Sequence, residues 1–388
     1  MNQEQWRAHV LDSHRGGKLA VQARMPLATR EDLAVAYTPG VALVSERIAR
    51  DPEAAWELTG RGNAVAVVSD GSAVLGLGAV GPLAALPVME GKAVLFKTLA
   101  GIDAYPVVLN VAGRDRVEEI VSAVQAFAPG FGGINLEDIA APWCFEIERR
   151  LTETLDIPVF HDDQHGTAVV VLAALRNAAR ATGRDLAMLR VVVVGAGAAG
   201  SAIARLLQAV EVADIVLVDR EGTLHAGRRF ESECKAKLAR ETNPRELVGG
   251  VAEALVGAHV LIGVSARGVV DPGSIATMAE DAIVFALANP DPEIEAHECP
   301  PNVRIFATGR SGDEQQINNV LAFPGIFRGL LNARATDVGD DIKLAAAGAL
   351  AGLVSDAELA AGKVIPSPLD ERCAPAVAHA VETVILAR

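Results

Sequence analysis

The strongest constraint on the fold is a run of four valines, Val191 to Val194, that leads directly into Gly195-Ala-Gly197-Ala-Ala-Gly200. The segment after it, Ser201 to Val210, has the apolar spacing of a helix, and the next apolar run ends in Asp219. A buried strand, a G-x-G-x-x-G turn, a helix and a second strand that ends in an acid form the opening unit of a doubly wound parallel sheet. This stretch therefore predicts both an α/β fold and a dinucleotide site.

Each position of this turn has its own physical role. Gly195 allows the tight turn, Gly197 lets the backbone approach a pyrophosphate, and Gly200 allows the helix to pack closely on the strand. The first helical residues, Ala198 and Ala199, offer backbone N–H groups to the phosphates. The competing interpretation is a glycine-rich turn without a ligand, and the surrounding strands, helix and acid make it the weaker one.

The same glycine pattern occurs a second time, in Gly76-Leu-Gly78-Ala-Val-Gly81, but in a different setting. Pro82 follows it directly, the strand before it is weak, and no acid ends a following strand where a ribose partner is expected. We interpret this stretch as a packing turn or a loop on the substrate side. The dinucleotide is therefore assigned to the turn that begins at Gly195.

Short β-branched runs alternate with longer Ala- and Leu-rich stretches along the chain, which is the pattern of strands joined by crossover helices. The predicted strands are Ala64–Ser69, Pro106–Asn110, Pro158–Phe160, Val191–Val194, Ile215–Asp219, Val260–Val264, Ile283–Ala286 and Arg304–Ala307. A mostly apolar helix is predicted over Gln164–Arg180. We place the domain boundary near its start, with one α/β domain over residues 1–160 and a Rossmann-type, doubly wound domain with C-terminal helices over 161–388.

The composition argues against several kinds of partner. A formal net charge of −14 disfavours a nucleic-acid backbone or an anionic membrane surface. No apolar run reaches the ~18 residues of a membrane span, and the N-terminal stretch lacks the apolar core of a signal peptide, so we expect a cytoplasmic protein. The four cysteines form no CxxC pair. A small ligand is the better partner, and an anionic one would need local positive charge, which a divalent metal can supply.

Two pairs of acids each fall just past a predicted strand, where open α/β sheets bind their ligands. The pairs are Glu137 with Asp138 and Asp162 with Asp163. Ligation by carboxylate oxygens suits Mg²⁺ or Mn²⁺. Two other interpretations stay open: the aspartates could cap helices, or Asp163 could bind zinc together with His161 and His165.

Further motifs give the chain a specific family resemblance. In chain order they are Tyr37-Thr-Pro-Gly-Val-Ala, Val88-Met-Glu-Gly-Lys92-Ala-Val-Leu-Phe-Lys97, Asn135-Leu-Glu-Asp-Ile, His161-Asp-Asp-Gln-His-Gly-Thr-Ala, Ala288-Asn-Pro and Gln316-Ile-Asn318-Asn319-Val-Leu-Ala-Phe-Pro-Gly. Together they resemble the short bacterial malic enzymes, and six ordered motifs are far more specific than one glycine pattern. The resemblance implies an N-terminal malic-type α/β domain followed by a Rossmann-type domain.

The resemblance also implies roles for individual residues. Lys92 resembles the catalytic base, Tyr37 the catalytic acid, and Asp162 the acid partnered with the lysine. The other implied roles are metal ligation by Glu137, Asp138 and Asp163, and contacts with substrate and nicotinamide by Asn289, Asn318 and Asn319. We expect a homodimer or a higher homo-oligomer.

The sequence departs from the family pattern at three places. Ala73 stands where longer relatives carry an arginine that contacts substrate, and Ala79 occupies a position that is often polar. Ser311-Gly-Asp-Glu-Gln replaces a more usual Ser-Asp-Tyr-Pro-Asn. These departures concern recognition of the substrate carboxylate and closure of a loop, and none removes a catalytic group.

The implied reaction is the oxidation and decarboxylation of L-malate to pyruvate and CO₂, through oxaloacetate, with reduction of NAD or NADP. A lysine base has an ordinary pKa of ~10.4, so we expect burial or a nearby cation to lower it. Three alternatives stay open. They are a malolactic-type enzyme that releases lactate, a 2-hydroxy-acid dehydrogenase that loses no CO₂ and needs no metal, and an NAD-sensing regulator on a Rossmann scaffold.

Asp219 favours NAD over NADP as coenzyme. Its carboxylate can accept hydrogen bonds from a ribose 2′-hydroxyl, whereas a 2′-phosphate would meet its negative charge. Two unit charges ~4 Å apart repel by ~4 kcal/mol at an effective dielectric near 20. Arg220, Arg228 or Arg229 could compensate that charge, so NADP stays open.

Overall fold

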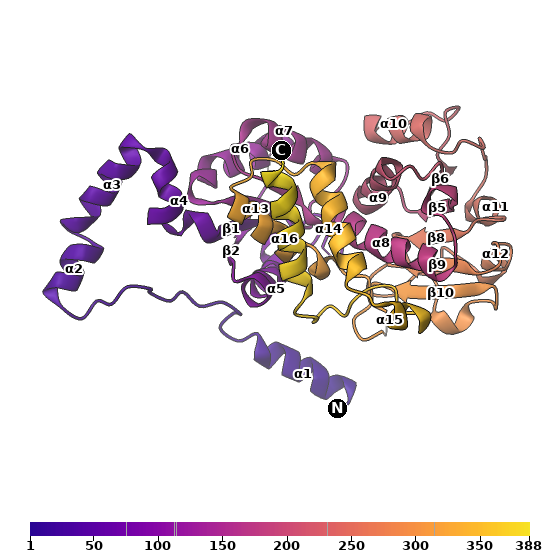
Figure 1. The fold of residues 1–388 in the computed structure, drawn as a ribbon, viewed down its shortest axis with the longest axis horizontal. Helices are drawn as coiled ribbons and strands as arrows, with labels where there is room; N and C mark the ends of the chain where they lie inside the picture. The colour runs from indigo at the N-terminus through magenta and orange to yellow at the C-terminus, as the bar shows by residue number, and fades with distance from the viewer. Residues whose placement is uncertain (75, 112, 114, 231, 314) are drawn as a thin grey trace.

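Two parallel sheets, one in each half of the chain, organise the fold (Figure 1). The computed structural model describes residues 1–388 except 75, 112, 114, 231 and 314. Glu314, in the stretch that departs from the family pattern, therefore lies outside the described residues. The α/β class predicted from the sequence is confirmed.

The first sheet has four parallel strands in the order β2-β1-β3-β4. They are β1 (Ala64–Ser69), β2 (Asp103–Val108), β3 (Gly133–Leu136) and β4 (Val159–His161). Alternate side chains of β1 pack on opposite faces, because Val65 and Val67 lie in one apolar cluster while Ala66 and Val68 lie in another. The helices that cover these faces are α5 (Pro82–Ala100) on one side and α6 (Arg116–Phe127) and α7 (Trp143–Thr154) on the other.

The second sheet has the order β10-β9-β8-β5-β6-β7, and all its strands are parallel except the short β7. They are β5 (Arg190–Val194), β6 (Asp214–Asp219), β7 (Gly222–Thr223), β8 (Val260–Gly263), β9 (Ala282–Ala286) and β10 (Val303–Thr308). The helices of this part are α9 (Ala198–Ala209), α10 (Glu233–Glu241), α11 (Val251–Leu255) and α12 (Pro272–Ala276). The chain leaves β5 to one neighbour and later returns to the other, so the crevice for a ligand lies beyond the ends of β5 and β8.

One long helix and the C-terminal helices connect the two sheets. α8 (Asp162–Ala181) starts directly after β4 and packs on α9 and α14. The C-terminal helices are α13 (Phe323–Ala333), α14 (Asp340–Gly352), α15 (Asp356–Ala360) and α16 (Cys373–Leu386). α13 and α16 pack on each other and on α5, so the end of the chain returns to the first sheet (Figure 1). In the described part of the chain, no helix combines the length and apolarity needed to cross a membrane.

The N-terminal residues form an arm that projects from this body (Figure 1). The arm consists of α1 (Gln3–Ser13), α2 (Arg30–Ala36) and α3 (Gly40–Arg50), and the chain returns through α4 (Ala55–Leu58). The described residues of α1, α2 and α3 include none that is buried. Large apolar side chains are nevertheless exposed along it: Trp6, Leu11, Val21, Leu27, Val35 and Leu43. Their exposure means that one copy of the chain does not supply the arm with a core.

Candidate active site

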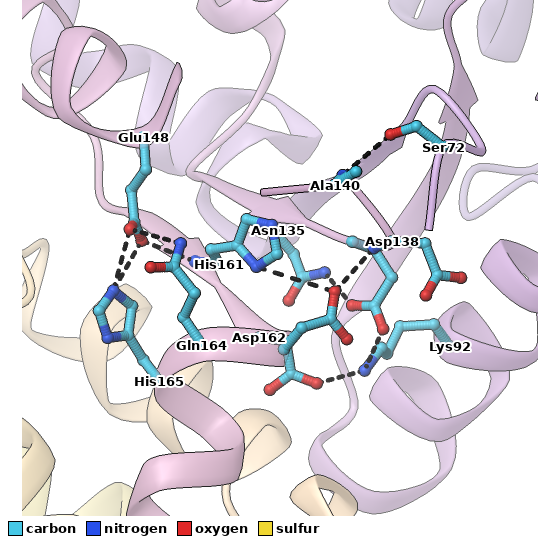
Figure 2. A network of polar contacts seen from close by, with 12 residues as sticks. Ser72, Lys92, Asn135, Asp138, Ala140, Glu148, His161, Asp162, Gln164 and His165 are labelled. Atoms are coloured by element: carbon cyan, nitrogen blue, oxygen red, sulfur yellow. Dashed lines mark hydrogen bonds and ion pairs between the residues drawn. The ribbon is translucent and has the colours of Figure 1, made fainter. Parts of the chain in front are cut away.

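Two pairs of acids emerge side by side from the first sheet. Leu136 at the end of β3 and His161 at the end of β4 are partners in the parallel register. The residues that follow them therefore leave the sheet at the same edge, and Figure 2 shows Asp138 and Asp162 there beside Lys92. This register is the physical reason why two motifs separated in the sequence meet at one place.

Three of these acids form a cluster with the geometry of a cation site. Carboxylate oxygens of Glu137, Asp138 and Asp163 lie within 4.8 Å of one another. The Asp138 backbone N–H also donates a 2.8 Å hydrogen bond to Asp163 Oδ2. Asp138 has a φ of 53°, a left-handed conformation that aspartate tolerates better than most residues. The three ligands implied by the resemblance are thus close together.

Capping does not explain the aspartates. α7 begins after Pro142 and α8 after His161, and among the described residues neither N-cap carries a capping side-chain hydrogen bond. Asp163 instead accepts from the Asp138 backbone, and Asp162 contacts Lys92. The helix-cap interpretation is therefore wrong for these acids.

Lys92 reaches the acids from α5 and is only 7% exposed. Its ammonium donates to the Asp162 carboxylate, lies 3.0 Å from Glu137 Oε1, and sits 4.0 Å from the centre of the Phe323 ring. Burial acts to lower the pKa of Lys92, but Asp162 and Glu137 outweigh it, so the pKa is raised. The sequence predicted a lowered pKa for Lys92, and for the chain without a bound cation this prediction is wrong.

Glu137 and Asp162 are buried, whereas the Asp163 side chain is 31% exposed. Burial raises the pKa of Asp162 and of Asp163 to about 6, against the partly compensating charge of Lys92, and burial also raises the pKa of Glu137. Within the described residues, Asp162 Oδ1 has no hydrogen-bond partner. Of the clustered Glu137, Asp138 and Asp163, only Glu137 contacts the Lys92 ammonium, so the cluster carries excess negative charge. Oxygen ligands of this kind suit Mg²⁺ or Mn²⁺. The residues present fit a divalent cation.

The two histidines of the motif do not form a zinc site with Asp163. His165 Nε2 contacts the Glu148 carboxylate at 3.0 Å, whereas His161 Nδ1 lies 3.8 Å from Asp163 Oδ2. Burial lowers the pKa of His161. Burial alone would raise the pKa of Glu148, but His165 and the donors around it lower that pKa to about 2. Sequence reasoning missed Glu148, which lies on α7 outside every quoted motif.

Tyr37 is not brought to Lys92 within one chain. It follows α2 on the arm and is 67% exposed, and the arm extends away from the sheet that positions Lys92 (Figure 1). Other exposed apolar side chains, Leu77 and Leu83, lie on the Gly76–Gly81 turn and at the start of α5.

The three asparagines lie in the segments that follow β9 and β10 of the second sheet. Asn319 begins a short 3-10 helix beside α8, where a Cβ added to Gly166 would lie 3.2 Å from the Cβ of Asn319. Asn318 caps that 3-10 helix with its side chain. Asn289 follows β9, and a Cβ added to Gly76 would lie 2.8 Å from its carbonyl oxygen. The second glycine pattern is therefore packed against the Asn289 loop, as the packing interpretation predicts.

The turn after β5 has the shape of a phosphate cradle. Gly195 has a φ of 114°, and a Cβ there would lie 2.5 Å from the Val264 carbonyl oxygen, while a Cβ on Gly200 would collide with the Gly195 carbonyl. A Cβ on Gly197, by contrast, would meet no described atom within 4 Å. The first and third glycines are thus required by packing, and the second leaves open space in front of the α9 N-terminus. An anion fits that space.

Asp219 is not a free carboxylate. Its oxygens form 2.8 Å ion pairs with Arg228 and with Lys235, and these groups outweigh the effect of burial and lower its pKa. Arg220, one of the three arginines considered from the sequence, is exposed instead. The contact of Lys235 with Asp219 was not predicted from the sequence, because Lys235 lies on α10, outside the glycine turn and its two strands.

Comparison with known proteins gives matches over most of the chain. Two family models match it, "Malic enzyme, N-terminal domain" over residues 16–152 and "Malic enzyme, NAD binding domain" over residues 164–385. The NAD-dependent malic enzyme of Geobacillus stearothermophilus is 52% identical over 95% of this chain and 76% of its own length. The bifunctional malic/malolactic enzyme of Bacillus subtilis (strain 168) is 49% identical over 94% of this chain and 89% of its own length.

Structural comparison gives the same result. The crystal structure of malic enzyme from Pyrococcus horikoshii Ot3 matches with a TM-score of 0.94 at 45% identity, and the match covers 98% of this chain and 91% of that one. The family models, the relatives and the shared fold, together with the clustered acids and lysine, lead to one conclusion: the chain belongs to the malic enzyme family.

Proposed function

We propose that the protein catalyses the metal-dependent oxidative decarboxylation of L-malate to pyruvate and CO₂, with reduction of a nicotinamide dinucleotide. The observation that carries this proposal is the contact of Lys92 with Asp162 and Glu137 beside the three-carboxylate cluster. A base and a cation site then act on the same substrate oxygen. Of the known relatives, the NAD-dependent malic enzyme of Geobacillus stearothermophilus supports this activity by its name.

Glu137, Asp138 and Asp163 would hold Mg²⁺ or Mn²⁺ through their clustered oxygens. When bound, the cation would supply positive charge that polarises the C2 oxygen of the substrate and offsets the carboxylates that keep Lys92 protonated. Lys92 would then accept the proton of the C2 hydroxyl, and Asp162 would hold its ammonium in place. The Phe323 ring packs against the Lys92 ammonium, 4.0 Å from its centre, where the lysine is buried.

We infer that Tyr37 serves the active site of a second copy. The arm buries none of its described helical residues, yet Tyr37 is the residue that resembles the catalytic acid. The exposed Leu77 and Leu83, in the turn before α5 and at the start of that helix, offer an apolar surface on which such an arm could pack. A homodimer in which each arm covers its neighbour would give the arm a core and bring Tyr37 to an active site.

Mixed subunits test this arrangement. Tyr37→Phe and Lys92→Ala chains are each expected to be nearly inactive in pyruvate formation. After unfolding and refolding together, shared sites would restore about a quarter of parental activity, because half of randomly formed dimers are mixed and each has one intact site. Refolding of each variant alone is the control. If the mixture stays as inactive as its parts, Tyr37 does not act across subunits.

The coenzyme choice is a finer proposal. We favour NAD, because each carboxylate oxygen of Asp219 has more than one lone pair and can accept a hydrogen bond from a ribose hydroxyl in addition to its ion pair. Arg228 and Lys235 already compensate its charge and would accept a 2′-phosphate, so NADP remains usable. Asn289 would contact the nicotinamide and the substrate, while Asn318 and Asn319 would bind the substrate carboxylate beside α8.

One assay tests the main proposal. Purified protein with L-malate, Mn²⁺ and either dinucleotide should give pyruvate, CO₂ and reduced coenzyme in equal amounts. Lactate without net reduced coenzyme would indicate the malolactic reaction, the activity that the name of the Bacillus subtilis relative includes. Oxaloacetate without CO₂ would indicate a simple dehydrogenase, and binding of NAD without turnover would indicate a regulator.

A further inference from the structure

We propose that Glu148 is a positioning residue that fixes the first turn of α8 and so aims Asp162 and Asp163 at the cation and at Lys92. The inference rests on the cation site proposed above. Glu148 belongs to α7, the helix that follows the turn containing Glu137 and Asp138. It therefore links the segment after one acid pair to the segment that carries the other.

The Glu148 carboxylate accepts three hydrogen bonds from the start of α8 (Figure 2). The His161 backbone N–H donates at 2.9 Å, Gln164 Nε2 at 3.1 Å and His165 Nε2 lies at 3.0 Å. Three of the five consecutive residues from 161 to 165 are thus held by one side chain. The two that it leaves are Asp162, which contacts Lys92 (Figure 2), and Asp163, which accepts from the Asp138 backbone N–H.

Glu148 takes the place of a missing helix cap. α8 has 20 residues, and in the described structure no side chain of its own caps its N-terminus. A carboxylate at that end satisfies a free N–H donor and interacts favourably with the helix dipole. Because a residue of α7 does this, the aspartates of the first turn need not fold back onto their own backbone. They are left for Lys92 and for the Asp138 turn.

A purely structural role would have a different signature. Glu148 is 13% exposed, so its loss would leave partly buried donors without an acceptor and would lower stability in any case. A packing residue would lower the unfolding temperature without changing ligand affinity in the folded protein. A positioning residue must change the affinity for the cation well below that temperature, because carboxylate ligands lose affinity when their orientation is not fixed.

Direct cation binding tests this role. Free Mn²⁺ is measured by electron paramagnetic resonance during titration of metal-free protein, which needs no turnover. Glu148→Gln should weaken Mn²⁺ binding by about 10-fold or more, the usual effect of removing a group that orients a ligand. Glu148→Asp should also weaken it, since the shorter side chain keeps the charge but cannot reach all three donors. Glu146→Gln is the matched control, because Glu146 lies on the same helix, is 47% exposed and pairs with Arg149.

The outcomes separate the two levels of the proposal. Parental Mn²⁺ affinity in Glu148→Gln, or full recovery in Glu148→Asp, would overturn the positioning role while the cation site stands. A parallel loss of NADH affinity, measured by fluorescence in EDTA, would show general loosening of the fold and would also overturn it. If the parent itself binds no Mn²⁺, the cation site fails, and the positioning role fails with it.

Discussion

Replacing Lys92 with methionine should destabilise the metal-free protein in a strongly pH-dependent way. Methionine fills most of the volume of the lysine side chain but removes the ammonium that Asp162 and Glu137 share. Two desolvated carboxylates would then face each other without a counter-charge. We expect a loss of about 3–5 kcal/mol in the free energy of unfolding at about pH 8, the usual effect of leaving a buried charge unpaired.

The magnitude follows from the geometry. At 3.0 Å and an effective dielectric near 20, the attraction between Lys92 and Glu137 is about 5.5 kcal/mol, which is an upper bound because lysine also regains hydration on unfolding. The pKa of Asp162 and of Asp163 is raised to about 6, and removing the ammonium raises it further. An acid with a raised pKa costs stability in full above that pKa; the cost declines as the pH falls below it and vanishes below the ordinary pKa of ~4. The difference between parent and variant should therefore shrink to less than half at about pH 5.

Urea unfolding in EDTA, followed by circular dichroism at both pH values, measures these free energies. Mn²⁺ should recover more stability in Lys92→Met than in the parent, because the cation replaces the lost charge. Lys97→Met is the control on the same helix: Lys97 is 56% exposed and pairs with Asp103, so its loss should cost less than about 1 kcal/mol. A Lys92→Met cost that does not change with pH would refute the electrostatic reasoning.

Four further predictions concern the two ligand sites. EDTA should abolish turnover and Mn²⁺ should restore it; undiminished activity in EDTA would contradict the cation site. Asp163→Asn should raise the dissociation constant for Mn²⁺ without a large change in the unfolding temperature. Tyr37→Phe should leave the oxidation of malate in the first turnover largely intact and slow the protonation of added enolpyruvate, measured by rapid-quench product analysis. Asp219→Ser should raise kcat/KM for NADP relative to that for NAD by about 10-fold or more. If this ratio does not change, Asp219 does not determine the choice of coenzyme. Gly197→Ala should keep the parental unfolding temperature but weaken NADH binding, since the added Cβ meets no described atom within 4 Å and occupies only ligand space.

Local patterns predicted most of the second sheet. The strand at Val191 to Val194 and the strand that ends in Asp219 are both observed, because several β-branched residues followed by a turn have few other structures available. β3 could not be delimited in the same way. Its four residues, Gly133–Leu136, include a glycine and an asparagine, and they become a strand because β1 and β4 pair with them on both sides.

Contacts between segments that are distant in the chain could not be predicted from the sequence. The motifs named Lys92 and the acids, but the raised pKa of Lys92 depends on how many carboxylates surround it, and that number comes from strand register. Glu148 and Lys235 act through helices that carry no motif. The return of the C-terminal helices to α5 likewise depends on complementary apolar faces, which one chain segment does not reveal alone.

Because of the exposed arm, the activity of this protein should depend on its concentration. A surface with this many exposed apolar side chains favours association, and an association equilibrium obeys mass action. If Tyr37 is supplied by a second copy, as proposed above, a lone subunit has no complete site, and specific activity should fall once the concentration drops below the dissociation constant of the dimer. Newly made chains would then be inactive until they dimerise. Damage to the arm of one subunit would inactivate the active site of the other subunit.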